Sequence, residues 1–227
     1  RVNLLFLAPF PLIWKAFLSD PVAMAMYLVA FGGLILAAWL TREGIKAETY
    51  GTTLLRGVTG SGKTEVYLEA VAAAIEAGRQ ALVLLPEIAL TEQFLDRVEE
   101  RFGAKPAEWH SGVTMTERRR IWRMVGEGNA QLVIGARSAL FLPFQSLGLI
   151  VVDEEHDTSY KQEDGVLYNA RDMAVLRASI CGAQVVLASA TPSLETWANA
   201  EAGKYRRLEL TSRFGPAVMP QMGAIDM

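Results

Sequence analysis

The stretch GVTGSGKT at residues 57–64 constrains the fold of this chain more than any other feature. Gly57, four further residues, and then Gly62, Lys63 and Thr64 form the complete Walker A pattern, which is credible only between a strand and a helix. Its glycines let the backbone curl until several N–H groups point into one cavity, where the helix N-terminus adds partial positive charge. The stretch therefore predicts a phosphate-binding loop within an α/β fold.

Phosphate chemistry assigns roles to the polar residues of this loop. The Lys63 ammonium is expected to reach the β and γ phosphates of ATP, and the Thr64 hydroxyl is expected to bind Mg²⁺. The alternative is a glycine-rich turn that only caps a helix, which would not require all of the constrained positions together. The loop residues expected to bind the nucleotide are Gly57, Thr59, Gly60, Ser61, Gly62, Lys63 and Thr64.

A second acidic site is needed for the metal ion, and LIVVDEEHD at residues 149–157 supplies it. Asp153 ends an apolar run, as a Walker B aspartate does, and is expected to bind both nucleotide and Mg²⁺. Glu154 is expected to activate the attacking water, because hydrolysis needs a carboxylate near the γ phosphate besides the metal ligand. The alternative for these acids is a solvated loop. The predicted catalytic residues are therefore Glu154, Asp153 and Lys63.

Hydrophobic residues make up 51% of the 227 residues, and after residue 50 they recur in short runs between amphipathic stretches. Nearly continuous apolar runs suit parallel strands that are buried on both faces. The expected strands span residues 52–57, 81–85, 131–136, 148–153 and 184–189. The expected helices span residues 63–77, 90–102, 115–126, 171–181 and 193–202. This alternation predicts βαβ crossovers and a mainly parallel, doubly wound sheet.

Residues 22–40 form a run of 19 residues without a charge, which is long enough for a helix that crosses a bilayer core of roughly 30 Å. Residues 2–14 are also apolar, and a Ser-Asp-Pro turn signal separates the two runs. Residues 1–50 are therefore expected to form an apolar helical hairpin, with membrane contact through residues 2–40. The basic flanks expected on the cytoplasmic side are Arg1, Arg42 and Lys46. A signal peptide fits less well, and the alternative is a buried helix pair in a soluble protein.

Charge and cysteine content exclude some classes of function. A formal net charge of −3 excludes a uniformly basic nucleic-acid coat but leaves room for a local basic groove. Cys181 is the only cysteine, so it can form neither an intrachain disulfide nor a multi-thiolate zinc site. This fits a reducing cytosolic setting. Cys181 itself, near the end of an expected helix, is interpreted as a buried small apolar residue.

Arginines cluster in TERRRIWRM at residues 116–124. In the expected helix the apolar residues form one seam and the arginines flank it. We interpret this face as solvated, with a grip on phosphates as the alternative. The tryptophans interpreted as core or rim anchors, rather than as platforms for base stacking, are Trp109, Trp122 and Trp197.

Two motifs resemble those of superfamily 2 helicases. DEEH at residues 153–156 is similar to the DExH box, and SATPS at residues 189–193 is similar to the motif that couples ATP state to nucleic-acid grip. Over about residues 53–214 the chain resembles the primosomal replication-restart DNA helicases, the primosomal protein N′ (PriA) family. The strings that carry this resemblance are GVTGSGKTEVYL (57–68), LLPEIALTEQ (84–93), HSG (110–112), IGARSALFLPF (134–144), VVDEEHDTSYKQEDG (151–165), YNARDMAVLRA (168–178) and LASATPSLET (187–196).

The resemblance implies the first RecA-like lobe of a DExH helicase that hydrolyses ATP with Mg²⁺, moves 3′ to 5′ on single-stranded or forked DNA, and works with primosome proteins. The residues that it implies as relays of the hydrolysis state are His156, Ser189 and Thr191. The implied contacts with the DNA backbone are Thr91, His110, Ser111, Arg137 and Ser138. An aromatic-rich, DNA-sensing loop of the family would hold Tyr160, Lys161 and Tyr168, since rings and cations suit stacking on bases. The alternative for each DNA contact is an ordinary turn, cap or surface residue.

The chain also departs from the pattern of that family, whose second lobe donates an arginine finger worth about 10³ to 10⁵ in rate. The second lobe also carries zinc-binding cysteine pairs. Residues 51–227 are expected to form one lobe only, so zinc is expected only in a second lobe and turnover should be slow. The lobe is expected to be cytoplasmic, and tethered to a membrane if residues 1–50 are a genuine anchor rather than a fused or misassembled frame. The alternative function is a membrane-anchored nucleotide-binding module without unwinding activity.

Overall fold

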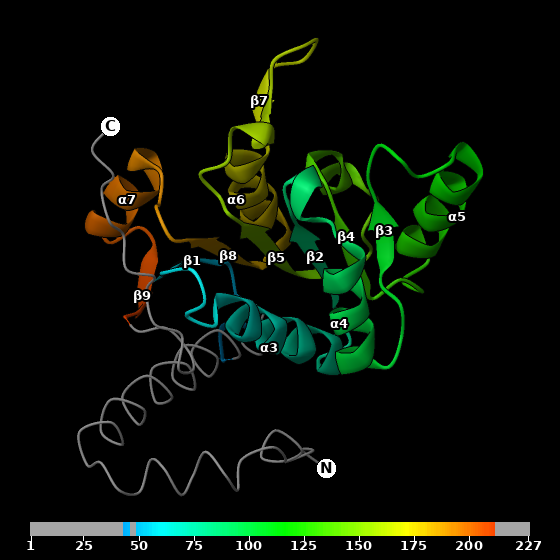
Figure 1. Cartoon of the computed structure of the whole chain (residues 1–227), viewed down its shortest axis with the longest axis horizontal. Coiled ribbons are helices and arrows are strands. Elements are labelled where there is room, and N and C mark those ends of the chain that lie inside the picture. The colour runs from blue at the N-terminus through cyan, green and yellow to red at the C-terminus, as the bar shows by residue number, and fades with distance from the viewer. Residues whose placement is uncertain (1–42, 46–48, 212–227) are drawn as a thin grey trace, which may run out of the picture.

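Runs rich in Val, Ile and Leu become the strands of one parallel sheet. The computed structural model describes residues 43–45 and 49–211. Its seven-stranded sheet has the order β3-β4-β2-β5-β8-β1-β9, and every neighbouring pair is parallel (Figure 1). The strands are β1 (Gly51–Gly57), β2 (Gln80–Leu84), β3 (Ala107–Trp109), β4 (Leu132–Gly135), β5 (Leu147–Asp153), β8 (Gln184–Ser189) and β9 (Arg206–Leu210).

Helices cover both faces of the sheet. One face carries α3 (Lys63–Glu76) and α4 (Glu92–Phe102), and the other carries α5 (Met115–Gly126) and α6 (Ala170–Cys181). Helix α7 (Leu194–Glu201) connects β8 to the edge strand β9. Short 3₁₀ turns span Glu87–Ala89, Arg137–Phe141 and Thr158–Tyr160. The antiparallel hairpin that projects from the body of the lobe is made of β6 (Lys161–Gln162) and β7 (Tyr168–Asn169) (Figure 1).

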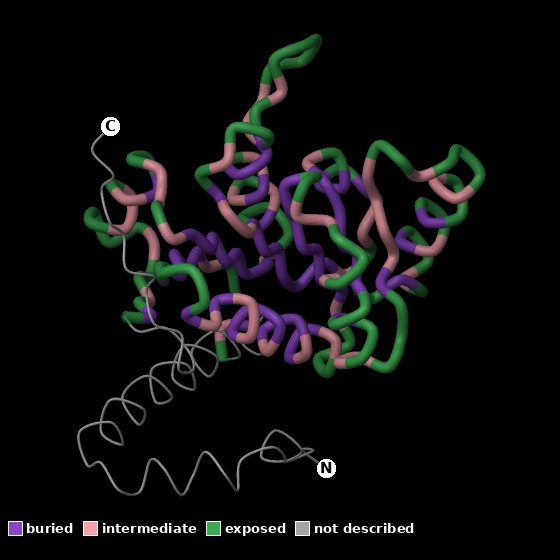
Figure 2. The backbone as a smooth tube through the Cα atoms, in the orientation of Figure 1, coloured by how far each residue is buried: buried purple, intermediate pink, exposed green. Residues whose placement is uncertain are grey.

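Side chains that alternate along the central strands fill one core on each face. Toward α3 and α4 the buried strand residues include Val83, Ile134 and Val151. Toward α5 and α6 they include Leu82 and Ile150. The central strands are accordingly buried along their whole length (Figure 2). Burial on both faces is the reason that these strands read as continuous apolar runs.

The register of the sheet brings the functional loops together. Asp153 on β5 pairs with Ala188 on β8, and Ala188 pairs with Leu55 on β1. The chain therefore leaves the carboxyl ends of these three neighbouring strands side by side, through the loops that follow Gly57, Asp153 and Ser189. In open α/β sheets, ligands bind outside the carboxyl ends of the strands, so a site is expected among these three loops.

The predicted fold class is confirmed. Every predicted strand and helix between residues 52 and 202 is present, with bounds that differ by at most two residues. Strands β3 and β9 and the β6–β7 hairpin were not predicted, because they are short and only partly buried and so lack a continuous apolar run. The prediction for Cys181 was wrong: it is exposed, because it ends α6 beyond Ala178, the last buried residue of that helix.

The expected membrane segment falls outside this description. Within residues 43–45 and 49–211, no helix is long and apolar enough to cross a membrane. Residues 2–40, which carry the expected apolar hairpin, lie outside the described residues, so that hairpin and the boundary at residue 50 stay predictions.

Candidate functional site

The phosphate loop leaves β1 at Gly57 and enters α3 at Lys63. Gly60 and Gly62 have φ angles of 78° and 90°, in the left-handed region that favours glycine. The Ser61 N–H donates to the Val58 carbonyl at 3.0 Å and so closes the loop. The shape of the loop thus depends on glycine at Gly62, which the Walker A pattern specifies, and also at Gly60, one of the four positions that the pattern leaves open.

Two donors in this loop suit a phosphate group. The Ser61 hydroxyl is buried and has no hydrogen-bond partner in the described part of the chain. The Lys63 ammonium donates to the Gly57 carbonyl at 2.7 Å. A Cβ atom at Gly57 would lie 2.4 Å from the Ser61 hydroxyl oxygen, so only glycine leaves that space open. Donors around a space that glycine keeps free fit the anionic phosphates of a nucleotide.

Asp153 ends β5 close to the first turns of α3, and its carboxylate is held from two sides. The Tyr67 hydroxyl donates to Asp153 Oδ2 at 3.0 Å, and the Glu154 N–H donates to Oδ1 at 3.0 Å. Thr64, one turn earlier on the same helix, lies near enough to Tyr67 to oppose the rise that burial causes in the pKa of its phenol. The two expected magnesium ligands, Thr64 and Asp153, therefore both lie beside one buried phenol. Mg²⁺ bound with a nucleotide uses one or two protein oxygens and completes its shell with water and phosphate, so this pair fits it.

The electrostatics support a shared site. Burial raises the pKa of the Asp153 carboxyl above its usual value, while the hydrogen bond from Tyr67 and the charge of Lys63 act in the opposite direction. The Lys63 ammonium is thus near enough to Asp153 for its charge to act on this carboxyl. Burial, followed by the charge of Asp153, raises the pKa of Tyr67 well above its usual value, so the phenol stays a neutral donor.

Tyr67 was not among the residues predicted for the site. Its place three residues after Thr64, on the helix face that packs against the sheet, is the signal that could have identified it. Within the described residues, no group of three or more His, Cys, Asp and Glu side chains is arranged to hold a metal ion.

Glu154 follows Asp153 in an unusual backbone conformation. Its φ angle is 46°, and it is the one non-glycine residue with positive φ in the described part of the chain. Its N–H donates to Asp153 and its carbonyl accepts from the Asp157 N–H at 2.8 Å, which defines a tight turn. The Glu154 carboxylate is 40% exposed and lies 3.6 Å from His156 Nδ1. A left-handed non-glycine residue costs on the order of 1–3 kcal/mol and tends to occur where function requires it.

The three predicted relay residues form one connected group. His156 Nδ1 lies 2.8 Å from the Ser189 hydroxyl oxygen, and this oxygen accepts from the Thr191 N–H at 3.0 Å. Ser189 is fully buried at the end of β8. The turn after β5 is thereby linked to the SATPS segment, an arrangement that agrees with the relay role but does not test it.

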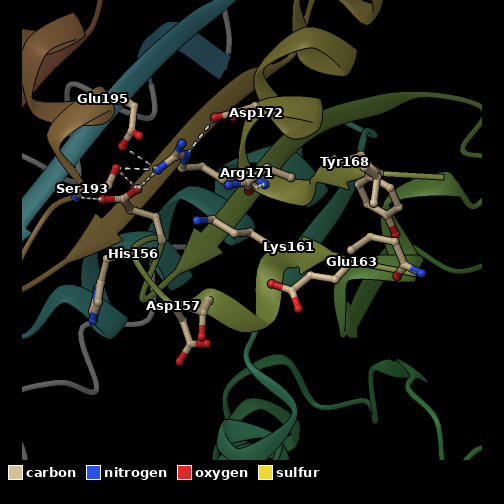
Figure 3. A pocket seen from close by; sticks show the side chains of 14 residues that line it. His156, Asp157, Lys161, Glu163, Tyr168, Arg171, Asp172, Ser193 and Glu195 are labelled. Carbon is tan, nitrogen blue, oxygen red and sulfur yellow. Dashed lines mark hydrogen bonds and ion pairs between the residues drawn. The ribbon is translucent and has the colours of Figure 1, made fainter. Parts of the chain in front are cut away.

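Glu155 is a buried hub that the sequence analysis did not assign. Its carboxylate accepts from the Ser193 N–H at 2.7 Å, the Ser193 hydroxyl at 3.0 Å and the Thr196 hydroxyl at 2.9 Å. Arg171 from α6 completes the cluster at 3.4 Å, while it also contacts Asp172 and Glu195 (Figure 3). The third residue of the DEEH sequence thus ties β5 to α6 and to the start of α7. Nothing in a run of acids indicates which one is buried, so this role required the structure.

The hairpin between β6 and β7 is anchored at its base. Arg137 donates to the carbonyls of Ser159 and Lys161 at 3.1 and 2.7 Å. Tyr160 is 1% exposed, and its hydroxyl lies 2.6 Å from the Asp153 carbonyl and 3.0 Å from the Leu84 carbonyl. The predicted DNA contact at Tyr160 is therefore wrong, because a ring buried in the core cannot stack on a base.

Lys161 and Tyr168 remain accessible on this hairpin. Lys161 is exposed, and Tyr168 is partly buried against Phe141, with the ring centroids 5.2 Å apart. A cavity of about 620 Å³ lies beside the hairpin and is lined by residues of both charges (Figure 3). Its lining includes Lys161, Tyr168, Arg171, Asp157 and Glu195. For Lys161 and Tyr168 the expected contact with DNA stays a prediction.

The other expected DNA contacts have local partners. Thr91 caps α4 and accepts from the Phe94 N–H at 3.3 Å, and Ser138 accepts from the Trp109 indole at 3.1 Å. His110 Nδ1 accepts from the Gly112 N–H at 3.2 Å, and the Ser111 hydroxyl lies 3.4 Å from Glu87 Oε2. These bonds explain why polar residues occur here and leave contact with DNA untested.

Comparison with known proteins gives consistent results. The DEAD/DEAH box helicase family matches residues 43–200. Replication restart protein PriA of Rickettsia felis is 51% identical over 180 residues, which are 79% of this chain and 28% of that protein. PriA of Bacillus subtilis is 45% identical over 186 residues, which are 82% of this chain and 23% of that protein. The chain thus spans about a quarter of the length of these relatives.

Solved structures show the same fold. RecG bound to a three-way DNA junction superimposes with a TM-score of 0.59 at 25% sequence identity, over 82% of this chain and 24% of that one. A hypothetical ATP-dependent RNA helicase from Sulfolobus tokodaii superimposes with a TM-score of 0.54 at 20% identity, over 76% of this chain and 51% of that one. At that identity the second likeness concerns the fold alone.

Proposed function

Because the chain belongs to the DEAD/DEAH box helicase family, we propose that its described residues form the ATP-binding motor lobe of a DNA helicase that acts in replication restart. The observation that carries the proposal is the position of Thr64 and Asp153 beside the Tyr67 phenol, next to a glycine-shaped phosphate loop. A helicase lobe needs this arrangement, and a membrane-anchored binding module has no specific observation in its favour.

In the proposed reaction, the loop N–H groups and Lys63 hold the phosphates of ATP. Thr64 and Asp153 would hold Mg²⁺, which would supply positive charge against the phosphate oxygens. Tyr67 keeps the Asp153 carboxylate in one orientation through its 3.0 Å hydrogen bond. Glu154 accepts a proton from the attacking water, and its solvent-accessible carboxylate suits that role.

We further propose that hydrolysis is relayed to nucleic acid through the SATPS segment. The 2.8 Å contact between His156 and Ser189 joins the turn that carries Glu154 to that segment. DNA, single-stranded or forked, is proposed as the partner because the chain is 51% identical to a replication restart protein and similar in structure to RecG, which was solved on a DNA junction. Primosome proteins are proposed as partners on the same sequence likeness.

Two substitutions test this function. Lys63→Ala is expected to abolish binding of a fluorescent ATP analogue, because it removes the cation that contacts two phosphates. Glu154→Gln is expected to leave that binding intact and to abolish phosphate release in a single-turnover assay, with and without single-stranded DNA. Unchanged turnover in both variants would contradict the proposal. The slow turnover that the sequence predicts for one lobe makes the single-turnover format necessary.

A further inference from the structure

A groove that the nucleotide site does not use lies along one flank of α5. Helix α5 packs inward through Ile121 and Val125, and lies at the β3 end of the sheet (Figure 1). Beside this inward face a groove of about 710 Å³ runs between α5, Trp109 of β3 and Pro143. Trp122 in this groove is 51% exposed. Trp122 is therefore not a core residue and lies at the rim, one of the two places expected for it, and an indole left open beside other apolar groups marks a binding surface.

Arginines make this groove cationic on a chain whose formal net charge is −3. Arg120 is engaged by Glu117 at 2.5 Å, but it does not line the groove. Arg119 and Arg123 do line it, are exposed, and form no ion pair with any residue of the described part. Their charges are thus free to bind an anion. A face that only contacts solvent would explain the exposed arginines, but it would not explain an exposed indole beside them.

Arg118 links the groove to the loop after β3. Its guanidinium lies over the Trp109 ring, 5.5 Å from the centroid, and donates to the His110 carbonyl at 2.8 Å. Its Nε atom is buried and has no hydrogen-bond partner in the described part of the chain. Residues 110 and 111 are expected to contact the backbone of the DNA strand. The groove therefore continues from the proposed DNA path and follows α5, a helix of 12 residues that spans about 18 Å.

We propose that the α5 groove binds a single strand of nucleic acid, with a base against the Trp122 indole and phosphates against Arg119 and Arg123. Interleaved aromatic faces and cations are the pattern of single-strand binding without sequence preference. The inference rests on the proposed DNA helicase function and adds to it a contact along α5, which begins next to the loop after β3 and extends beyond the contacts expected at residues 110 and 111. An acidic peptide would also satisfy the arginines, but it would leave the stacking face of Trp122 unexplained.

The test measures binding of fluorescein-labelled oligothymidylate to the 227-residue chain by anisotropy over a series of salt concentrations. Trp122→Ala is expected to weaken binding about tenfold without changing the salt dependence, since stacking is worth about 1–3 kcal/mol per base. Trp122→Phe, which keeps a ring, is expected to restore most of the affinity. Arg123→Ala is expected to reduce the slope of log K against log salt by about 0.7, the value for one phosphate contact on a single strand.

Lys204→Ala provides the matched control, because it also removes one exposed positive charge but lies next to β9, at the opposite edge of the sheet. It should change neither affinity nor slope. Equal binding by wild type and all variants would overturn the groove and leave the proposed function intact, whereas no binding by the wild type would defeat both. A third outcome would also overturn the proposed groove. If Trp122→Ala and Arg123→Ala lost binding to a polyglutamate peptide but kept wild-type binding to DNA, the groove would be a site for an acidic peptide.

Discussion

Glu154 and Glu155 are adjacent residues of the same type, and the structure predicts opposite results for the same substitution. Glu155 is fully buried and accepts four hydrogen bonds, one of them from Arg171, whose side chain is only 8% exposed. The Glu154 side chain is 40% exposed, and its carboxylate lies 3.6 Å from His156 Nδ1. Glu→Gln at each position keeps the size of the side chain and changes only charge and donor pattern.

The size of the effect follows from these contacts. The NH₂ group of a glutamine at 155 has two possible positions. In one it faces the Ser193 N–H, and in the other it faces Arg171 and the hydroxyls of Ser193 and Thr196. In either position at least one donor faces another donor. Breaking a buried ion pair from one side costs about 3–5 kcal/mol. Because Arg171 keeps Asp172 at 2.8 Å, we expect the lower end, about 3 kcal/mol. For a domain of this size that corresponds to a fall in Tm of roughly 6–12 °C.

Thermal unfolding followed by circular dichroism checks this prediction. Glu155→Gln should unfold at clearly lower temperature, while Glu154→Gln should unfold within about 2 °C of wild type, as expected for a half-exposed position. In single-turnover ATP hydrolysis, Glu154→Gln should be inactive despite its normal stability. Equal Tm values for the two variants would refute the assignment of Glu155 as the structural carboxylate and of Glu154 as the solvent-facing one.

Three further predictions concern the same site. Tyr67→Phe should weaken magnesium-dependent binding of a fluorescent ATP analogue about tenfold, since a hydrogen bond to a charged group is worth about 1.5–3 kcal/mol, and should leave magnesium-free binding unchanged; an unaltered magnesium midpoint would count against it. Asp153→Asn should raise Tm at pH 7 and have no effect near pH 3. Burial raises the pKa of the Asp153 carboxyl in the folded protein, so the ionised carboxylate destabilises the fold at pH values above about 3.9, the pKa of an aspartate in the unfolded chain. A gain in Tm that is the same at both pH values would contradict that cause. Arg137→Ala should speed tryptic cleavage after Lys161, because two hydrogen bonds at the base of the hairpin are lost, and an unchanged cleavage rate would show that Tyr160 alone holds it.

The sequence predicted those parts of the fold in which a local pattern and the tertiary structure agree. The strand that ends at Asp153 is buried on both faces, so its apolar run is unbroken and its end is clear, while the strand before Gly57 is marked by the Walker A glycines that follow its buried Leu54 and Leu55. Strand β9 has the sequence RRLEL, and Leu210 is its only buried residue, so no apolar run predicts this strand. Its place in the sheet is set by pairing with β1, a long-range contact that no local window contains.

The site divides in the same way. Lys63, Thr64 and Asp153 could be predicted as candidates because phosphate and metal chemistry fixes their residue types and their positions, two at the start of the helix after the phosphate loop and one at the end of a strand. Tyr67 and Glu155 act through packing, since one reaches Asp153 from a neighbouring helix and the other reaches residues of two distant helices. Tyr160 shows the converse: its sequence neighbours suggested an exposed ring, and only the course of the loop after β5 reveals that its side chain turns into the core.

The strand order has a consequence for how the lobe opens. Strand β5 is the fourth of seven, with three strands on each side, whereas β3 and β9 are at the margins. Local openings begin where the fewest buried contacts hold the backbone, so amide protons of β3 and β9 should exchange with deuterium before those of β5. Strands β3 and β9 can therefore open and close repeatedly while the carboxylates of Asp153 and Glu154, at the end of β5, stay in position.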